Sequence, residues 1–267
     1  MAKVICVANQ KGGVGKTTTA INLAASLACA EKRTLLLDMD PQGNAGSGIG
    51  INITESVPNI YHAIIGERSI RESIYPTELN FLDISPSNQD LIGAEIELVS
   101  AIARETKLKD AIEKIRNDYD FIIIDCPPSL GLLTLNAITA ADSVLIPLQC
   151  EYYALEGLTR LLNTVELIKK SINKNLVVEG ILLTMFDARN NICHEVVKEV
   201  KSHFPSEVFE SVIPRNVKLS EAPSFGKPII LYDVKSKGCE SYLKLAKELI
   251  SRNGYKHETL VMAESVN

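Results

Sequence analysis

Long hydrophobic runs are absent from this 267-residue chain, and no stretch approaches the roughly 20 apolar residues that a membrane-spanning helix needs. No signal-peptide pattern opens the chain. Its six cysteines are scattered, and no two of them form a Cys-x-x-Cys pair. These absences disfavour membrane proteins, disulfide scaffolds and Cys-x-x-Cys redox or zinc sites. We therefore expect reduced, mostly buried cysteines in a cytoplasmic protein.

An overall excess of positive charge is also missing. The formal net charge of −5 argues against a protein that coats nucleic acid over its whole surface. The charge is uneven, however, because residues 181–257 carry 12 Lys and Arg against 9 Asp and Glu, whereas residues 1–180 carry 16 against 22. Ordinary solvated surface accounts for this modest asymmetry as readily as a phosphate-binding patch does.

No internal repeat, low-complexity segment or Pro/Ser-rich linker divides the chain. Strand-length apolar runs alternate with stretches of helical periodicity, which predicts an α/β fold with a doubly wound, mostly parallel sheet flanked by helices. We expect one domain over residues 1–267, with a short tail from about residue 258. Within it, the pattern predicts a short helix over 60–65, a long helical region over 91–116 and an amphipathic helix through 242–250.

The segment NQKGGVGKTTT, residues 9–19, lies between a strand-like apolar run (4–8) and a helical stretch (20–28). Glycines allow the backbone to curl so that successive N–H groups and a helix N-terminus face an anion. The pattern predicts a phosphate-binding loop (P-loop), with Lys16 at the β- and γ-phosphates and the Thr17 hydroxyl on Mg²⁺. The predicted nucleotide contacts are Lys11, Gly12, Gly13, Val14, Gly15, Lys16, Thr17 and Thr18.

This loop departs from the usual Gly-x-x-x-x-Gly-Lys-Ser/Thr pattern, because Gln10 stands at the first glycine position and Lys11 follows it. The run KGGVGKT resembles the deviant Walker A motif of the ParA/MinD superfamily. The resemblance implies that Lys11 reaches the nucleotide of a partner subunit across an ATP-bound sandwich dimer. The alternative is a glycine-rich turn that binds no ligand. It does not explain why two lysines and Thr17 occupy the positions that a phosphate-binding loop needs.

Carboxylates follow two further apolar runs. Residues 34–38 lead into Asp40 within DMDPQGN, and residues 121–125 end in Asp125 before Cys-Pro-Pro. Ligands of open α/β sheets bind beyond the carboxyl ends of strands, so Asp125 can hold Mg²⁺ directly or through water. Alone, Asp40 favours an Asx-turn. Its segment resembles the switch-I-like segment of the ParA/Soj branch, which implies that Asp40 positions the attacking water and Asp38 supports the lysine or metal network.

The last third of the chain supplies the remaining candidates. Residues 208–216 are predicted to form a strand, and in the family this strand end closes around adenine. The resemblance thus implies that Pro214 and Asn216 contact the base, and no Asn-Lys-x-Asp guanine motif is present. The resemblance also implies a surface whose Lys and Arg side chains bind DNA. The alternative role of these side chains is to form surface ion pairs with Asp187 and Glu221. The candidate cations are Arg189 and Lys218, followed by Arg215 and Lys227.

Taken together, the motifs resemble a ParA/Soj-type ATPase of chromosome or plasmid partition, from residue 4 to about residue 250. The resemblance implies ATP and Mg²⁺ as cofactors and an ATP-dependent homodimer that binds double-stranded DNA without sequence preference. It further implies a ParB-type centromere-binding partner that stimulates hydrolysis, and association with the nucleoid. The implied catalytic residues are Lys11, Lys16 and Asp40.

The sequence fits several other functions less well. A MinD-type cell-division regulator ends in a basic amphipathic membrane helix, whereas residues 257–267 contain two acids and no Lys or Arg, so we expect no membrane binding. A nitrogenase iron-protein-type reductase needs two well-placed cysteines, and neither Cys126 nor Cys150 has an obvious partner. A DNA-tethering scaffold with a silent ATP site conflicts with the intact Lys16, Asp40 and Asp125. Regulation of replication initiation stays open.

Overall fold

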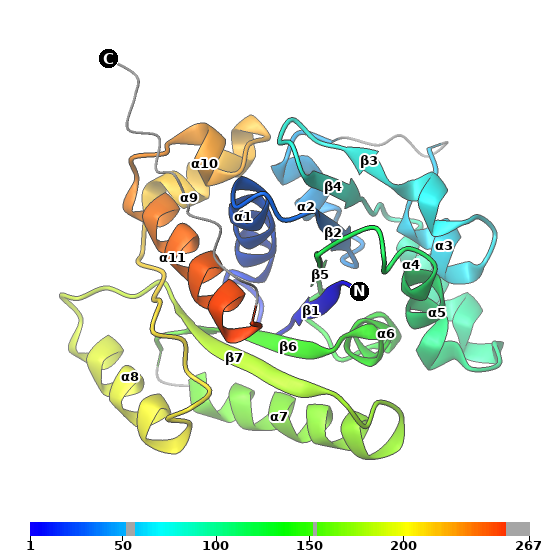
Figure 1. The fold of residues 1–267 in the computed structure, drawn as a ribbon. Helices are drawn as coiled ribbons and strands as arrows, with labels where there is room; N and C mark the ends of the chain where they lie inside the picture. Colours follow the sequence, from blue (N-terminus) through cyan, green and yellow to red (C-terminus); the bar gives the residue numbers. More distant parts are fainter. Residues whose placement is uncertain (52–56, 152–153, 255–267) are drawn as a thin grey trace.

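A seven-stranded sheet runs through the centre of the computed structural model, which describes residues 1–51, 57–151 and 154–254 (Figure 1). The strand order is β3-β4-β2-β5-β1-β6-β7, and every neighbouring pair is parallel except β3 and β4. The strands are β1 (Lys3–Val7), β2 (Thr34–Asp38), β3 (Tyr75–Pro76), β4 (Leu82–Ser85), β5 (Phe121–Asp125), β6 (Ser143–Gln149) and β7 (Val177–Thr184).

Helices cover both faces of this sheet (Figure 1). One face carries α1 (Lys16–Cys29), α2 (Asn44–Gly48), α9 (Val217–Glu221), α10 (Ile229–Tyr232) and α11 (Lys237–Arg252). The other face carries α3 (Ile60–Ile65), α4 (Leu91–Glu97), α5 (Lys107–Glu113), α6 (Leu132–Ala140), α7 (Ala154–Ser171) and α8 (Asn191–His203). This arrangement confirms the predicted doubly wound α/β fold.

The central strands are apolar throughout because both of their faces are buried. In β1, Val4 and Cys6 pack into one core cluster while Ile5 and Val7 pack into the other. Successive side chains of a strand point to opposite faces, so a strand with helices on both sides needs an unbroken apolar run. Because the strands are parallel, their carboxyl ends meet along one edge, where the loop after β1 and the turn after β2 lie together.

Several predicted elements match the structure. The strand over 34–38 has the predicted bounds, and the apolar run that ends in Asp125 forms the strand β5. Helix α3 spans 60–65 and ends at Gly66, whose φ of 84° is left-handed. The amphipathic helix predicted through 242–250 is α11. No helix of the described residues is long and apolar enough to cross a membrane. The predicted tail from about residue 258 lies outside the described residues.

Two predicted elements were wrong. The helical region over 91–116 is broken into α4 and α5 with short 3₁₀ turns between them, because Ala103 adopts a left-handed backbone with φ 53°. The strand over 208–216 is reduced to two isolated bridges, one of them joining Phe186 and Pro214. The backbone N–H groups of Glu210 and Ser211 donate to the carboxylate of Glu248 on α11, each at 2.9 Å. The Ser211 N–H is therefore not available to pair with β7, whereas Phe209 and Ile213 on either side of it do pair.

Candidate functional site

The loop between β1 and α1 curls through two left-handed glycines. Gly13 has φ 73° and Gly15, the N-cap of α1, has φ 89°. A Cβ at either position would meet no atom within 4 Å, so backbone conformation rather than space requires glycine there. No side chain caps α1, which leaves the N–H groups of its first turn directed at the loop interior. Such a terminus favours an anion.

Side chains at both ends brace this loop against the sheet. The Asn9 side-chain amide donates to the carbonyl of Pro147 at 2.7 Å, and its oxygen accepts from the Lys11 N–H at 3.0 Å. Across the loop, the Thr184 hydroxyl at the end of β7 donates to the carbonyl of Val14 at 2.9 Å. The loop is therefore tied to β6 and β7 before any ligand is bound, which makes it a preorganised cradle.

Lys16 places its ammonium inside the curl. Its Nζ donates to the carbonyl oxygen of Lys11 at 3.0 Å, and the residue is 7% exposed. Burial lowers the pKa of Lys16, while the carboxylates of Asp125 and Asp40 act in the opposite direction. The predicted phosphate-binding lysine thus lies where phosphates would sit, in an environment rich in negative charge.

Asp125 has the geometry of a metal ligand. Both of its carboxylate oxygens are buried, and neither has a hydrogen-bond partner within the part of the chain that the structure describes. Burial raises the pKa of Asp125, the neighbouring Asp38 raises it further, and the nearby Thr17 hydroxyl acts the other way. A dry carboxylate beside a hydroxyl offers the oxygen ligands that Mg²⁺ prefers. Thr17 and Asp125 therefore fit the predicted magnesium site.

This geometry makes a prediction about stability. In the metal-free protein, Asp125→Asn replaces a buried carboxyl group that has no hydrogen-bond partner among the described residues and that faces Asp38. The midpoint of thermal unfolding should therefore not fall and should rise by a few degrees. The same variant should lose the stabilisation that MgATP gives the wild type. Scanning calorimetry with EDTA and with MgATP measures both effects. A clear drop in the unfolding midpoint of the metal-free variant would contradict the interpretation that the buried Asp125 carboxylate destabilises the metal-free protein.

The turn after β2 is built on Asp38. One oxygen of its buried carboxylate accepts from the Asp40 N–H at 3.1 Å, and the other accepts from the N–H groups of Ala45 and Gly46. Burial raises the pKa of Asp38 to about 7. The expectation that Asp38 supports the lysine or metal network stays a prediction: its oxygens are hydrogen-bonded to backbone, and it lies beside Asp125 on the neighbouring strand. Asp38 fixes the position of the turn that carries Asp40.

Asp40 does form an Asx-turn, since its Oδ1 accepts from the Gln42 N–H at 3.0 Å. Its carbonyl also accepts a hydrogen bond from the Ser87 hydroxyl. Among the described residues, Oδ2 has no hydrogen-bond partner. The local turn and the proposed role with water are therefore compatible, because one carboxylate oxygen shapes the turn and the other stays available.

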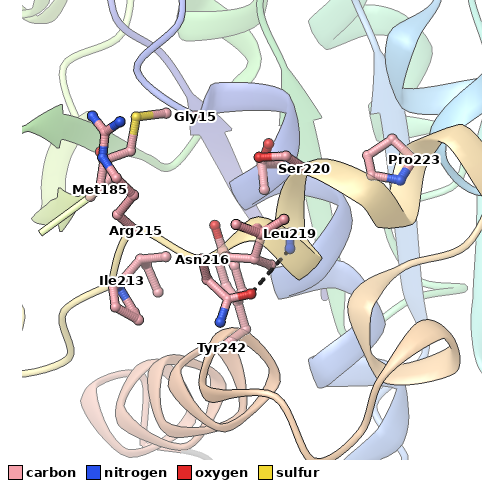
Figure 2. Close-up of a pocket in the computed structure, with 13 residues that line it drawn as sticks. Gly15, Met185, Ile213, Arg215, Asn216, Leu219, Ser220, Pro223 and Tyr242 are labelled. Carbon is pink, nitrogen blue, oxygen red and sulfur yellow. Dashed lines mark hydrogen bonds between the residues drawn. The ribbon is translucent and has the colours of Figure 1, made fainter. Parts of the chain in front are cut away.

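A cavity of about 450 Å³ opens beside the N-terminus of α1 (Figure 2). Its walls come from the end of β7, the segment 213–220 and α11, and it contains both predicted base contacts, Pro214 and Asn216. The Asn216 side-chain oxygen accepts from the Leu219 N–H at 3.3 Å, capping α9 (Figure 2). The lining residues are Gly15, Thr18, Thr184, Met185, Ile213, Pro214, Arg215, Asn216, Val217, Leu219, Ser220, Pro223 and Tyr242.

Sequence reasoning missed much of this cavity wall. Met185 adopts a left-handed φ of 51°, which is unusual for a non-glycine residue and turns the chain at the end of β7. Tyr242 reaches the cavity from α11, and its hydroxyl lies 3.2 Å from that of Thr19. Thr184 and Met185 could have been found as the residues that follow an apolar strand, whereas nothing local marks Tyr242. A mostly apolar slot with a few polar groups suits a flat base.

Lys11 lies outside this cradle, on the exposed rim of the loop. Its ammonium pairs with Glu151 at 2.5 Å, and both side chains are more than two-fifths exposed. A surface pair of this kind contributes little to stability and exchanges readily. Lys11 is thus available to leave Glu151 for a stronger anion.

Of the predicted DNA residues, Arg189, Arg215 and Lys218 are exposed and Lys227 is half-buried. The alternative ion pairs foreseen for Arg189 and Lys218 are present. Arg189 binds Asp187 through two hydrogen bonds, at 2.9 and 2.8 Å, and holds the pKa of that carboxyl well below its usual range. Lys218 pairs with Glu221 at 2.9 Å.

The remaining two DNA candidates differ in their surroundings. Arg215 lines the cavity and also lowers the pKa of Asp187, which places it near Arg189. Lys227 lies farther from this group and faces Glu78 at 3.9 Å. Exposed pairs are weak, so phosphates can displace these carboxylates.

The chain is similar to known proteins over most of its length. A family model described as an AAA domain matches residues 2–178. The chain is 64% identical to the chromosome partitioning protein ParA of Myxococcus xanthus, over 95% of this chain and 89% of that protein. It is 57% identical to the sporulation initiation inhibitor protein Soj of Bacillus subtilis, over 95% of this chain and 100% of that protein.

A solved structure has the same fold. Cobyrinic acid a,c-diamide synthase from Mycobacterium smegmatis, with bound ADP and magnesium, superposes with a TM-score of 0.84. The two sequences are 35% identical, and the match covers 96% of this chain and 97% of that one.

Proposed function

Because this chain belongs to the ParA/Soj family of chromosome partitioning ATPases, we propose that ATP joins two copies of it into a DNA-binding dimer. The chain hydrolyses ATP with Mg²⁺ as cofactor. In the proposed cycle, the ATP-bound dimer holds double-stranded DNA of any sequence within the nucleoid. A ParB-type centromere-binding partner then stimulates hydrolysis, and the separated subunits leave the DNA.

The observation that carries this function is the charge arrangement within the P-loop. The Lys16 ammonium is buried inside the curl, and the Asp125 carboxylate beside it has no hydrogen-bond partner among the described residues. Phosphoryl transfer needs little more from a protein than positioning and charge neutralisation. Magnesium, when bound, neutralises charge on the phosphates and polarises them.

Each residue of the site has a distinct proposed task. Lys16 and the N–H groups of α1 hold the phosphate oxygens, and Thr17 and Asp125 hold the metal. Asp40, fixed by Asp38, accepts a hydrogen bond from the attacking water through its free Oδ2. Pro214 and Asn216 lie in the cavity that would take the base.

Two other functions are less supported. The solved neighbour named as a cobyrinic acid a,c-diamide synthase shares 35% of its residues with this chain, whereas the two relatives with partition and sporulation names share 64% and 57%. The same two names disfavour a MinD-type regulator. The tail of residues 257–267, on which the membrane argument rested, lies outside the described residues. A partition role therefore has the stronger support.

Dimerisation through Lys11 provides the test. Lys11→Ala should bind ATP about as well as the wild type, because Lys11 lies outside the cradle of its own subunit, but it should fail to form the ATP-dependent dimer. Sedimentation velocity with a slowly hydrolysed ATP analogue measures this. The matched control is Glu151→Gln, which breaks the same ion pair yet keeps the lysine, and it should dimerise normally. A Lys11→Ala protein that dimerises like the wild type would rule out a role in trans.

A further inference from the structure

The outer surface of α4 is apolar and has no partner among the described residues. Leu91, Ala94 and Leu98 are buried in the core, while Ile92 is 51% exposed and Ile96 is 74% exposed. Val99 and Ile102, in the turns that follow, are also largely exposed. Surface apolar residues scattered singly are ordinary, whereas here four large exposed ones lie within eleven positions of the chain.

Helix geometry explains why these side chains share one face. At about 100° per residue, Ile92 and Ile96 point in nearly the same direction, one turn apart, and Val99 continues that line. Glu95 stands at the edge of the face, and Glu97 is turned to the Tyr61 hydroxyl at 2.9 Å. We call Ile92, Ile96 and Val99 the α4 face.

The α4 face adjoins the P-loop through the segment that follows β5. A Cβ on Gly131 would lie 2.4 Å from the Glu95 carboxylate, so the start of α6 touches the edge of the face. Leu130, 41% exposed, is the preceding residue. At the other end of this short segment, Pro128 lies 4.0 Å from a Cβ built on Gly12, next to Lys11. The patch and the loop rim are thus parts of one surface.

We propose that the α4 face, together with Leu130, is the apolar part of the interface between two copies of this chain. The inference rests on the proposed ATP-dependent dimer, and it assigns that dimer a surface. If Lys11 of one copy reaches the nucleotide of the other, the surface around Lys11 must also lie in the interface. The α4 face is part of that surface.

Symmetry and charge select a second copy over other occupants. In a two-fold dimer the same patch occurs on both subunits, so each copy contributes an identical apolar face to the surface around the interface. Interface cores are depleted in charge and rich in large apolar side chains, as this face is. Its flanks carry Asp90, Glu95 and Glu97, which makes DNA an unsuitable occupant because phosphates would be repelled.

The test is the double variant Ile92→Glu/Ile96→Glu. We expect it to bind a fluorescent ATP analogue as the wild type does, because no nucleotide contact is altered, while its ATP-dependent dimer weakens by at least tenfold in sedimentation velocity. The control is Val177→Glu. Val177 is a similarly exposed apolar residue at the start of β7, the end of the parallel sheet away from the P-loop, and its variant should dimerise normally.

Every outcome of this experiment decides the proposal. Normal dimerisation of the double variant would overturn it and leave the proposed function intact, and loss of stimulation by a ParB-type partner alone would reassign the face to that partner. A wild-type chain that stays monomeric with ATP would overturn both this inference and the proposed dimer. The milder Ile96→Ser should still fold, as judged by circular dichroism, and should weaken the dimer by about threefold, so the proposal is tested even if the double variant is unstable.

Discussion

Replacing Asp40 with alanine should slow ATP hydrolysis by about two to four powers of ten, the range expected when a positioned base or water-orienting group is lost. ATP binding should stay close to wild type, because the proposed phosphate contacts come from the P-loop and Lys16. Asp40 belongs to the turn after β2, and among the described residues no hydrogen bond joins its side chain to the P-loop. Phosphate release and equilibrium binding of an ATP analogue, measured on the same preparation, separate the two effects.

The Asx-turn complicates this experiment, because Asp40→Ala also removes the acceptor for the Gln42 N–H. Asp40→Asn resolves the difficulty, since an asparagine oxygen can still accept that hydrogen bond while the carboxylate charge is lost. Asp40→Asn should therefore hydrolyse ATP nearly as slowly as Asp40→Ala. If Asp40→Asn turned over at the wild-type rate, the carboxylate would have no part in the chemistry and the turn alone would matter.

Reversing the charge of Arg189 should weaken DNA binding by the ATP-bound dimer by about tenfold or more at low salt. Each dimer carries two copies of the residue, so Arg189→Glu removes two phosphate contacts and introduces two repulsive charges. The logarithm of the binding constant should also fall less steeply with the logarithm of salt concentration. Fluorescence anisotropy with two unrelated duplexes at several salt concentrations measures both quantities, and the two duplexes should respond alike because phosphate contacts carry no sequence information.

Arg160 supplies the matched control. Like Arg189, it is an exposed arginine in a surface ion pair, here with Glu156 within α7. Arg160→Glu should leave DNA binding unchanged. Equal losses in both variants would mean that net charge, and not the surface around Arg189, governs binding. An Arg189→Glu dimer with wild-type affinity would place the DNA surface elsewhere.

The parts of the site that the sequence predicts are those encoded locally. The P-loop, Asp40 and Asp125 each follow directly from a short apolar run, and parallel pairing then brings the carboxyl ends of those strands together. In register, Asp38 lies beside Asp125 on the neighbouring strand, which explains why their titrations influence each other. Local pattern and sheet topology together were enough to bring these candidate residues to one edge of the sheet.

What the sequence could not predict depends on contacts between distant segments. Tyr242 enters the cavity only because α11 packs on α1, and Glu151 meets Lys11 across a loop. The strand expected over 208–216 failed because Glu248, more than thirty residues away, takes the N–H groups of Glu210 and Ser211. The helical spacing of apolar residues over 91–116 likewise does not predict the left-handed backbone at Ala103. In each case tertiary contacts override a local preference.

The central claim is that bound ATP, before it is hydrolysed, joins two subunits and places them on DNA. Sedimentation velocity of Asp40→Ala with MgATP, with MgADP and with an unrelated DNA duplex tests it most directly, because this variant should hold ATP without consuming it. We expect the Asp40→Ala variant to be a monomer with ADP and a lasting dimer with ATP, and to co-sediment with DNA only when ATP is bound. An unchanged mass in both nucleotide states, or DNA binding that ignores the nucleotide, would contradict it.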